Sequence, residues 1–338
     1  MKQGNFTELA KHYHNRPAYS PLLLKKLLAC INDAHLPLNK LKVAEVGAGT
    51  GKLTAMLARD FGLQVSAVEP NDAMRAEGIK ATAGLGVRWH KGSGEDTGLP
   101  SGSADWLIMA SSFHWTNPAK SLPEFARVLR GGSSHSVNLS ENSTKNSQNA
   151  QNTHPQTPSA REGAYNVAAQ RERERERERD EAAPNSQNLS QICSKNSQLH
   201  AKNSQICSKN SAPNSYFTIL YNPRDIKQGS VFYEIEQEIK NLVPELNRVS
   251  SGLQNAKDWA EVLVSTGHFT DCVFMECAYS EAWSKERYMG AWHSVNDIQV
   301  QAGQKRWEAI LAMIERKIAP FSELEIPYKI RAWSARKV

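Results

Sequence analysis

Hydrophobic and polar positions divide the chain into short apolar runs that alternate with amphipathic stretches. Apolar runs of strand length lie at 42–46, 64–70, 87–91 and 104–110. Helical spacing of apolar residues occurs at 50–59 and 118–130, and Asn71 can cap a further helix between them. Alternation of this kind predicts an α/β fold with a mostly parallel sheet and helices on both faces.

The same patterns continue in the last third of the chain. Strands are predicted at 216–223, near 271–283 and within 325–336, and helical patterns lie at 231–243, 255–266, 284–292 and 301–318. Two late strands added to a sheet that begins parallel suggest a C-terminal antiparallel hairpin.

Residues 133–215 differ abruptly from the rest in composition. This segment is rich in Asn, Ser and Gln, repeats SQICSKNS, and contains the alternating run RERERERER at 171–179. So few apolar residues cannot offset the entropy of ordering the chain, so we predict a mostly disordered insert. The expected organisation is therefore 1–132, the insert 133–215, and 216–338. Joining the two flanks gives an ordinary connection from a helix to the strand at 216–223.

Composition narrows the classes of protein. The 338 residues are 40% hydrophobic and carry a net charge of +6, without basic clusters interleaved with aromatics. No run of about 18 apolar residues occurs, and the N-terminus lacks the apolar segment of a secretory signal. The five cysteines form no C-x-x-C pair. We expect a cytoplasmic, monomeric protein with no nucleic-acid partner, no membrane span and no metal site.

The stretch EVGAGTG at 45–51 packs glycines at alternate positions after the first predicted strand. It departs from the dinucleotide pattern G-x-G-x-x-G, because Lys52 stands at the third glycine position, and from the P-loop, because Leu53 follows Gly51-Lys52. It matches E-x-G-x-G-x-G in full. The loop predicts close approach of backbone to a nucleotide-like ligand, without deciding which ligand.

In order and spacing, the motifs resemble the class I S-adenosylmethionine-dependent methyltransferases, specifically the small-molecule group with the type 11 domain. The loop at 45–51, Glu69-Pro70, the stretch GSGED with LP at 92–100, ASSFHW at 110–115 and ARVLRGG all match. KHYHNRPAYS and IPYKIRAWSARK resemble the lead-in and closing strand of the subgroup that contains trans-aconitate methyltransferase. The resemblance covers nearly everything except the insert. It implies a Rossmann-like fold with a seven-stranded sheet.

The resemblance also implies S-adenosylmethionine as cofactor. Its candidate binding residues are Glu45, Gly47, Ala48, Gly49, Gly51, Glu69, Pro70, Met74, Ser93, Gly94, Glu95 and Ala110, with Tyr13 and Arg16 in a lid. Glu45 suits cationic or polar neighbours, and Glu69 can accept hydrogen bonds from ribose hydroxyls. Ser93 and Gly94 stand where the family usually has Asp or Thr and then Ala.

Methyl transfer to a small molecule requires alignment and exclusion of water, and requires a base only if the acceptor must lose a proton. His114 is the candidate base, although it could equally shape the pocket wall. Tyr19, Trp115, Trp292 and His293 are candidate substrate residues. Two alternatives stay open: a catalytically silent S-adenosylmethionine-binding protein, and an NAD-dependent oxidoreductase.

Overall fold

A computed structural model describes residues 6–131, 213–247 and 258–338. The predicted disorder of 133–215 therefore lies outside the described residues, except at its last three positions. Among these, Ser215 is fully buried, its hydroxyl donates to the carbonyl of Arg130 at 2.8 Å, and its carbonyl accepts from Lys337 N at 2.9 Å. The predicted insert therefore overlaps the described fold by its last three residues.

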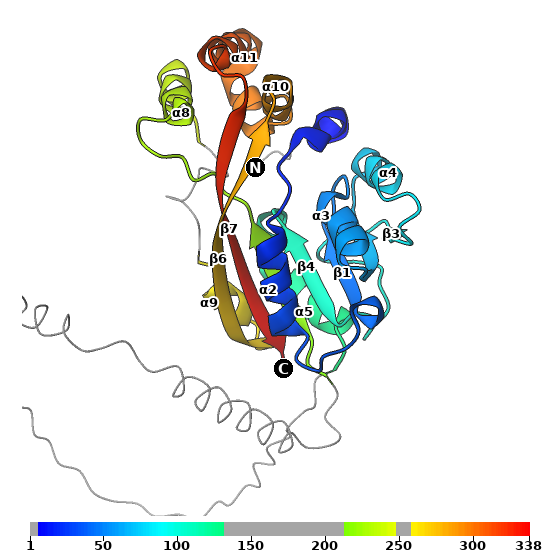
Figure 1. The fold of residues 1–338 in the computed structure, drawn as a ribbon. Helices are drawn as coiled ribbons and strands as arrows, with labels where there is room; N and C mark the ends of the chain where they lie inside the picture. Colours follow the sequence, from blue (N-terminus) through cyan, green and yellow to red (C-terminus); the bar gives the residue numbers. More distant parts are fainter. Residues whose placement is uncertain (1–5, 132–212, 248–257) are drawn as a thin grey trace, which may run out of the picture. The chain divides into compact units, whose positions relative to one another are not determined.

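One sheet of seven strands organises the described residues. The strands are β1 (Lys42–Val46), β2 (Gln64–Val68), β3 (Arg88–His90), β4 (Trp106–Ala110), β5 (Tyr216–Tyr221), β6 (Phe269–Trp283) and β7 (Leu324–Lys337). Their order is β3-β2-β1-β4-β5-β7-β6 (Figure 1). The pairs from β3 to β5 are parallel, whereas β7 is antiparallel to both β5 and β6. The predicted fold class is confirmed.

Helices and helical turns connect the strands. They are α1 (Phe6–Leu9), η1 (Ala10–Asn15), α2 (Pro21–Ile31), η2 (Leu38–Lys40), α3 (Lys52–Ala55), η3 (Met56–Asp60), α4 (Asp72–Ala81), η4 (Phe113–Trp115), α5 (Pro118–Val128), α8 (Val231–Leu242), α9 (Ala260–Val264), α10 (Lys285–Trp292) and α11 (Asn296–Ile318). No helix in the described ranges is both long and apolar enough to cross a membrane.

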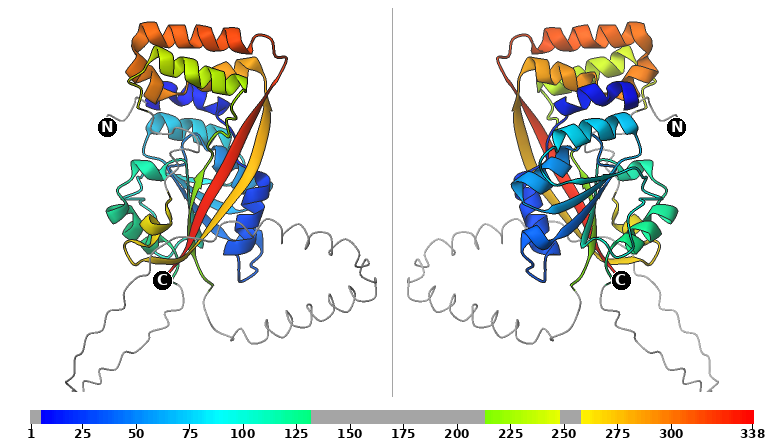
Figure 2. Two further views of the ribbon diagram at one scale, coloured as in Figure 1. Left: turned by 90° about the vertical axis from the view of Figure 1, so that its left-hand side faces the viewer. Right: turned by 90° about the vertical axis from the view of Figure 1, so that its right-hand side faces the viewer.

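Alternate residues of the central strand β4 face two different cores. Trp106, Ile108 and Ala110 belong to the cluster under α2 and α3, whereas Leu107 and Met109 belong to the cluster under α5 and α9. Figure 2 shows these helices on opposite sides of the sheet. All five strand residues are buried, which explains why β4 is a continuous apolar run rather than an alternating pattern.

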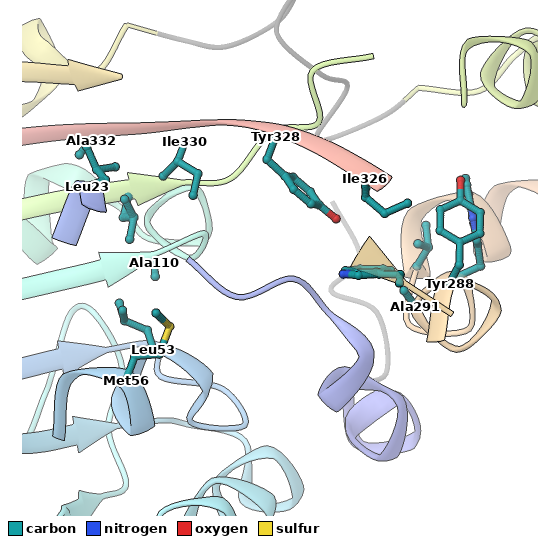
Figure 3. Packing of buried hydrophobic residues seen from close by; sticks show 14 of the residues in the cluster. Leu23, Leu53, Met56, Ala110, Tyr288, Ala291, Ile326, Tyr328, Ile330 and Ala332 are labelled. Atoms are coloured by element: carbon teal, nitrogen blue, oxygen red, sulfur yellow. The ribbon is translucent and has the colours of Figure 1, made fainter. Parts of the chain in front are cut away.

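The helices α8, α10 and α11, with the ends of β6 and β7 that lie beside them, form what we call the cap (Figures 1 and 2). β6 and β7 pair over thirteen positions, from Phe269 with Lys337 to Trp283 with Leu324. Because the other strands are six residues or shorter, this ribbon continues past them. Figure 3 shows Tyr328 and Ile326 of β7 together with Tyr288 and Ala291 of α10 in the same apolar cluster as Leu53 and Met56.

Two elements differ from the predicted ones. The helix predicted at 50–59 is a short α3 followed by the π-helical turn η3. α2 lies outside every predicted element, although Ser20 caps it, Pro21 opens it, and its leucines repeat at helical spacing. It covers one face of the sheet and so completes the core rather than the site.

Candidate functional site

The glycine loop crosses the carboxyl ends of β1 and β2, where open α/β sheets bind their ligands. The N–H groups of Gly47 and Ala48 both donate to the carbonyl of Val68, at 2.9 and 3.0 Å, and Gly51 N donates to the carbonyl of Ala48 at 2.9 Å. Gly47, Gly49 and Gly51 all have positive φ. The loop is thereby folded back tightly against the end of β2 before α3 begins.

Gly47 shows why this loop needs glycine. Its φ is 70°, and a Cβ built there would lie 2.6 Å from the hydroxyl oxygen of Ser112. The Ser112 hydroxyl in turn donates to the carbonyl of Val46 at 3.2 Å. The loop therefore packs directly on the segment after β4, leaving room only for backbone.

Glu45 lies inside the protein at the penultimate position of β1. Its side chain accepts a 2.5 Å hydrogen bond from the Thr54 hydroxyl, and the residue is 2% exposed. Burial raises its pKa to about 8, against the Thr54 hydrogen bond, and the nearby Glu69 charge adds to the rise. A cation placed beside this carboxyl would favour its ionised form.

Glu69 directly follows β2 and binds the glycine loop. One carboxylate oxygen accepts from Gly49 N and the other from Asn71 N, both at 2.9 Å. Burial raises its pKa, whereas these two backbone hydrogen bonds and the Arg75 charge lower it. Each oxygen keeps the capacity to accept another hydrogen bond, which a ribose diol could supply.

Met74 and Pro70 lie near this acid in the sequence but differ in burial. Met74, in the first turn of α4, is 5% exposed, and its methyl carbon lies 3.5 Å from where a Cβ of Gly49 would stand. Pro70 is exposed. Met74 therefore contacts the glycine loop directly, while Pro70 shapes the chain between β2 and α4.

The turn after β3 is built around Ser93. Its hydroxyl accepts from the N–H groups of Glu95 and Asp96, both at 3.2 Å, and a Cβ at Gly94 would lie 2.5 Å from the Thr116 methyl. Glu95 accepts from Asn117 N at 2.7 Å. Ser93 thus forms the turn with its hydroxyl, as an Asp or Thr oxygen could, and the Thr116 methyl occupies the space that an alanine methyl at position 94 would need.

β4 ends at Ala110, and Ser111 then takes φ 54°, which is unusual for a residue other than glycine. Ser111 N donates to the carbonyl of Leu220 at 2.7 Å and is held there. The Tyr19 side chain hydrogen-bonds Ser111, although burial still raises the pKa of Tyr19 to about 12. Tyr19 therefore lies at the end of β4, and its phenol keeps its proton at neutral pH.

His114 lies in the η4 turn next to the end of β5. Its Nδ1 is 3.2 Å from the hydroxyl of Tyr221, and the His114 ring lies 4.7 Å from the ring of Trp115. Burial lowers the pKa of His114 to about 4, so the imidazole is neutral at pH 7. Trp115 is 40% exposed beside it, whereas Tyr221 stacks on Trp259.

Residues 10–20, here called the strap, join the glycine loop to the cap. Arg16 donates from Nε to the Ser294 hydroxyl at 2.6 Å and from Nη2 to the Ser294 carbonyl at 2.7 Å. The guanidinium also lies 5.2 Å from the centre of the Tyr13 ring. On the other side, Lys52 Nζ donates to the carbonyl of His14 at 2.9 Å. Arg16 is therefore engaged with the cap, and Tyr13, whose pKa rises by burial, is close enough to feel the charge of Glu69.

The strap is also held at Ala18 from both sides. Ala18 N donates to Glu281 at 2.7 Å, and the Ala18 carbonyl accepts from Asn222 Nδ2 at 2.7 Å. Glu281 further accepts from Arg287 at 2.7 Å. These contacts fix the backbone immediately before Tyr19.

The two candidate residues at the end of α10, Trp292 and the C-cap His293, lie in different surroundings. Trp292 is fully buried in the cap core, with the Arg224 guanidinium 5.0 Å from its ring centre. His293 is exposed, and its ring lies 5.4 Å from the ring of His12 in the strap. His293 thus faces the strap, and Trp292 faces the loop after β5.

Several residues of the site carry no pattern that the sequence alone displays. They are Thr54, Ser111, Ser112, Tyr221, Asn222, Arg224, Glu281 and Ser294. Ser111, Asn222 and Arg224 follow the ends of parallel strands, where ligands generally bind, so their positions give a general signal. Glu281 and Ser294 give no such signal, because they bind Ala18 and Arg16 of the N-terminal strap.

Comparison with known proteins finds a similarity in the first part of the chain. Residues 44–137 match the family model described as "Methyltransferase domain". This segment is therefore similar to methyltransferase domains. The match begins in β1 and includes the glycine loop, Glu69 and the ends of β3 and β4. The fold and this family imply S-adenosylmethionine as cofactor, and the glycine loop and two buried acids described above are chemically suited to it.

Curated relatives share this first part of the chain. An uncharacterized methyltransferase of Mycobacterium tuberculosis (strain ATCC 25618 / H37Rv) is 38% identical over 121 residues, covering 35% of this chain and 44% of that protein. A candidate methyltransferase of Dictyostelium discoideum is 31% identical over 126 residues, covering 37% of this chain and 44% of that protein. The chain thus spans less than half the length of these relatives.

A solved structure extends the similarity of fold to nearly the whole chain. A candidate type II methyltransferase of Anaeromyxobacter dehalogenans superposes with a TM-score of 0.51, covering 95% of this chain and 97% of that one. The two sequences are 15% identical, so this likeness concerns the fold. The similarity of fold therefore continues through β5, β6 and β7.

Proposed function

We propose that the protein transfers the methyl group of S-adenosylmethionine to a small-molecule acceptor. The observation that carries this proposal is the pairing of two buried acids, Glu45 and Glu69, across a glycine loop that permits only backbone at Gly47. S-adenosylmethionine presents an ammonium, a ribose diol and no phosphate. Acids at the ends of β1 and β2 match that chemistry, whereas a phosphate would require cationic or N–H partners there.

In this proposal Glu45 lies beside the ammonium and Glu69 binds the ribose hydroxyls. Met74 contacts the adenosine, and Ser93, Gly94 and Glu95 border the adenine. Tyr13 and Arg16 cover the cofactor from the strap. The bound cofactor supplies a methyl group activated by its sulfonium, and the protein aligns the acceptor and excludes water.

The acceptor lies in this proposal beside the ends of β4 and β5, bordered by Tyr19, His114, Trp115 and His293. Because His114 is neutral, with a pKa lowered to about 4, it is a weak base and a good hydrogen-bonding group. An acceptor that is already deprotonated, such as a carboxylate, would need no base. The same proposal places the protein in the trans-aconitate methyltransferase subgroup and makes it a monomer. It also treats the flanks 1–132 and 216–338 as one functional unit.

Binding and turnover together test the proposal. Calorimetry should detect S-adenosylmethionine and S-adenosylhomocysteine but not NADH, because the loop lacks the third dinucleotide glycine. Protein incubated with cofactor labelled in the methyl group and a metabolite extract should then label a small molecule. Binding of NADH alone would favour an oxidoreductase, and cofactor binding without labelled product would favour a silent binding protein.

The matched variants are Glu69→Gln and Glu276→Gln. Glu276 lies on β6, where it pairs with Lys329 and Arg331 of β7, outside the cofactor motifs. Glu69→Gln should weaken S-adenosylhomocysteine binding by about 10- to 100-fold, the range expected for one or two lost charged hydrogen bonds. Equal effects of the two variants would contradict the ribose role of Glu69.

A further inference from the structure

Buried donors without partners gather where the loop after β5 meets the cap. Arg224 Nη1, Tyr288 Oη and Trp292 Nε1 are all buried, and none makes a hydrogen bond of good geometry within the described residues, although the Tyr288 hydroxyl lies near both other groups. Each such atom destabilises the folded protein unless water or a ligand satisfies it. Native proteins keep few of them, so a group of three at one place indicates something that binds there.

The three side chains lie against one another. The Arg224 guanidinium is 5.0 Å from the ring centre of Trp292 and 5.7 Å from that of Tyr288, and the two rings are 6.2 Å apart. The backbone of Arg224 also forms an isolated antiparallel β-bridge with the backbone of Tyr328, whose side chain extends from β7 toward the helix of Tyr288 in Figure 3. A single guanidinium is thus walled by aromatic rings, with an indole N–H and a phenol beside it.

The charge of Arg224 is only partly compensated. The nearest carboxylate oxygen, on Glu236, is 3.9 Å from Nη1, which is too long for a hydrogen bond. Burial raises the pKa of Tyr288, so its phenol keeps its proton and can donate. The group therefore offers one positive charge and several donors, which is the complement of a monoanionic oxygen pair.

Its place in the fold connects it with the acceptor. Arg224 is three residues beyond Tyr221, whose hydroxyl contacts His114, and so within about 10 Å of it along the extended chain. Asn222, between them, holds the carbonyl of Ala18 just before Tyr19. A ligand bound by Arg224 would reach the region that the proposed function gives to the acceptor.

We infer that Arg224, Tyr288 and Trp292 form a subsite that binds a carboxylate of the methyl acceptor and so determine acceptor specificity. This inference rests on the proposed function. A planar carboxylate matches the fork of a guanidinium and its single charge, and the aromatic walls exclude water from the pair. A phosphate dianion would leave one negative charge uncompensated in the same surroundings.

The variants separate a ligand role from a structural one. Arg224→Met removes the charge, Arg224→Lys keeps the charge without the fork, and Tyr288→Phe removes only the hydroxyl. Arg336→Met is the control, because Arg336 is a partly exposed arginine of β7 paired with Asp271. If the phenol only fills the core, Tyr288→Phe should leave turnover unchanged.

The assay uses the full chain, cofactor tritiated in the methyl group, and a metabolite extract divided by anion exchange into an eluate and a flow-through. Binding of S-adenosylhomocysteine is measured first for every protein. We expect labelled product only when the eluate supplies the acceptor. We expect the same result when the eluate has first been treated with phosphatase. At limiting eluate, Arg224→Met should lower the rate about 10- to 100-fold, Arg224→Lys and Tyr288→Phe less, and Arg336→Met not at all. The rates should converge at saturating eluate, and Tyr288→Phe should melt no lower than the wild type.

Label from the flow-through alone, or loss of label after phosphatase treatment, would overturn the carboxylate subsite. Equal rates for the wild type and Arg224→Met would also overturn it, and would mean that a buried water satisfies these donors. Absence of any label from protein that binds S-adenosylhomocysteine would instead overturn the proposed function, and the subsite with it.

Discussion

The protonation of Glu45 should link cofactor binding to pH. The residue is 2% exposed and accepts a hydrogen bond from the Thr54 hydroxyl, and burial holds its pKa at about 8. In the free protein it is therefore mostly protonated below neutral pH. If the cofactor ammonium lies beside it, binding requires the carboxylate and releases the proton.

The magnitude follows from that pKa. Ionising a group two pH units below its pKa costs about 2.7 kcal/mol, since one unit corresponds to about 1.4 kcal/mol. Cofactor affinity should therefore rise about tenfold per pH unit below pH 7 and level off near pH 8. Glu45→Gln should bind more weakly near pH 7.5 and show no such slope. Thr54→Val, which removes the hydrogen bond that lowers the Glu45 pKa, should move the profile to higher pH.

Calorimetry of S-adenosylhomocysteine binding, from about pH 5.5 to 7.5, measures both quantities. The upper limit stays below the pKa of the ligand's own amino group, about 7.7–8.0. Pairs of buffers with different ionisation enthalpies should give nearly one proton released per ligand near pH 6.5 for the wild type, and fewer for Glu45→Gln. Glu69→Gln should weaken binding at every pH but keep the slope. Identical pH profiles for the wild type and Glu45→Gln would refute the reasoning.

The same pKa shift has a consequence for folding. The folded-state pKa of Glu45 lies above its unfolded value of 4.5, so its contribution to stability is full below pH 4.5 and declines as pH rises towards about 8. The decline cannot exceed about 5 kcal/mol, because 3.5 units correspond to that free energy. Denaturant titrations of the apoprotein should therefore show a falling stability between these pH values that Glu45→Gln removes.

The other predictions concern the loop, the histidine and the insert. Gly47→Ala should destabilise the protein by about 1–3 kcal/mol more than Gly102→Ala, because both glycines have positive φ but only Gly47 would clash; equal melting temperatures would contradict this. His114→Gln should keep cofactor affinity within about twofold and leave the shape of the pH–rate profile above pH 6 unchanged, since its pKa is about 4. Deleting 133–212 should preserve the melting temperature and cofactor binding, whereas a deletion that also removes the buried Ser215 should lower both.

Local patterns were sufficient for the strands and for the position of the glycine loop. The run 42–46 is β1 without any shift, and the run 104–110 contains β4, because a strand buried on both faces must be apolar throughout. The glycine loop and Glu69 are close in sequence to the strands that end at them, so motif and geometry coincide. α2 has the signals of a helix as well, yet its role in covering the sheet depends on packing rather than on a motif.

The acceptor side of the site depends instead on contacts between distant parts of the chain. Arg16 reaches Ser294, Ala18 is held by Asn222 and Glu281, and Tyr19 covers Ser111, so most of these pairs are separated by more than 200 residues. No periodicity predicts such partners, because each is fixed only when β5, β6 and the cap have assembled.

This dependence has a functional consequence, because the strap touches both halves of the site. Lys52, beside the glycine loop, binds its His14 end, and Glu281, on β6, binds its Ala18 end. A cofactor that orders the loop would also stabilise the strap, and the strap places Tyr19 over the end of β4. The proposed cofactor and acceptor sites are therefore joined through one short segment, and weakening either anchor should affect acceptor binding before it affects the sheet.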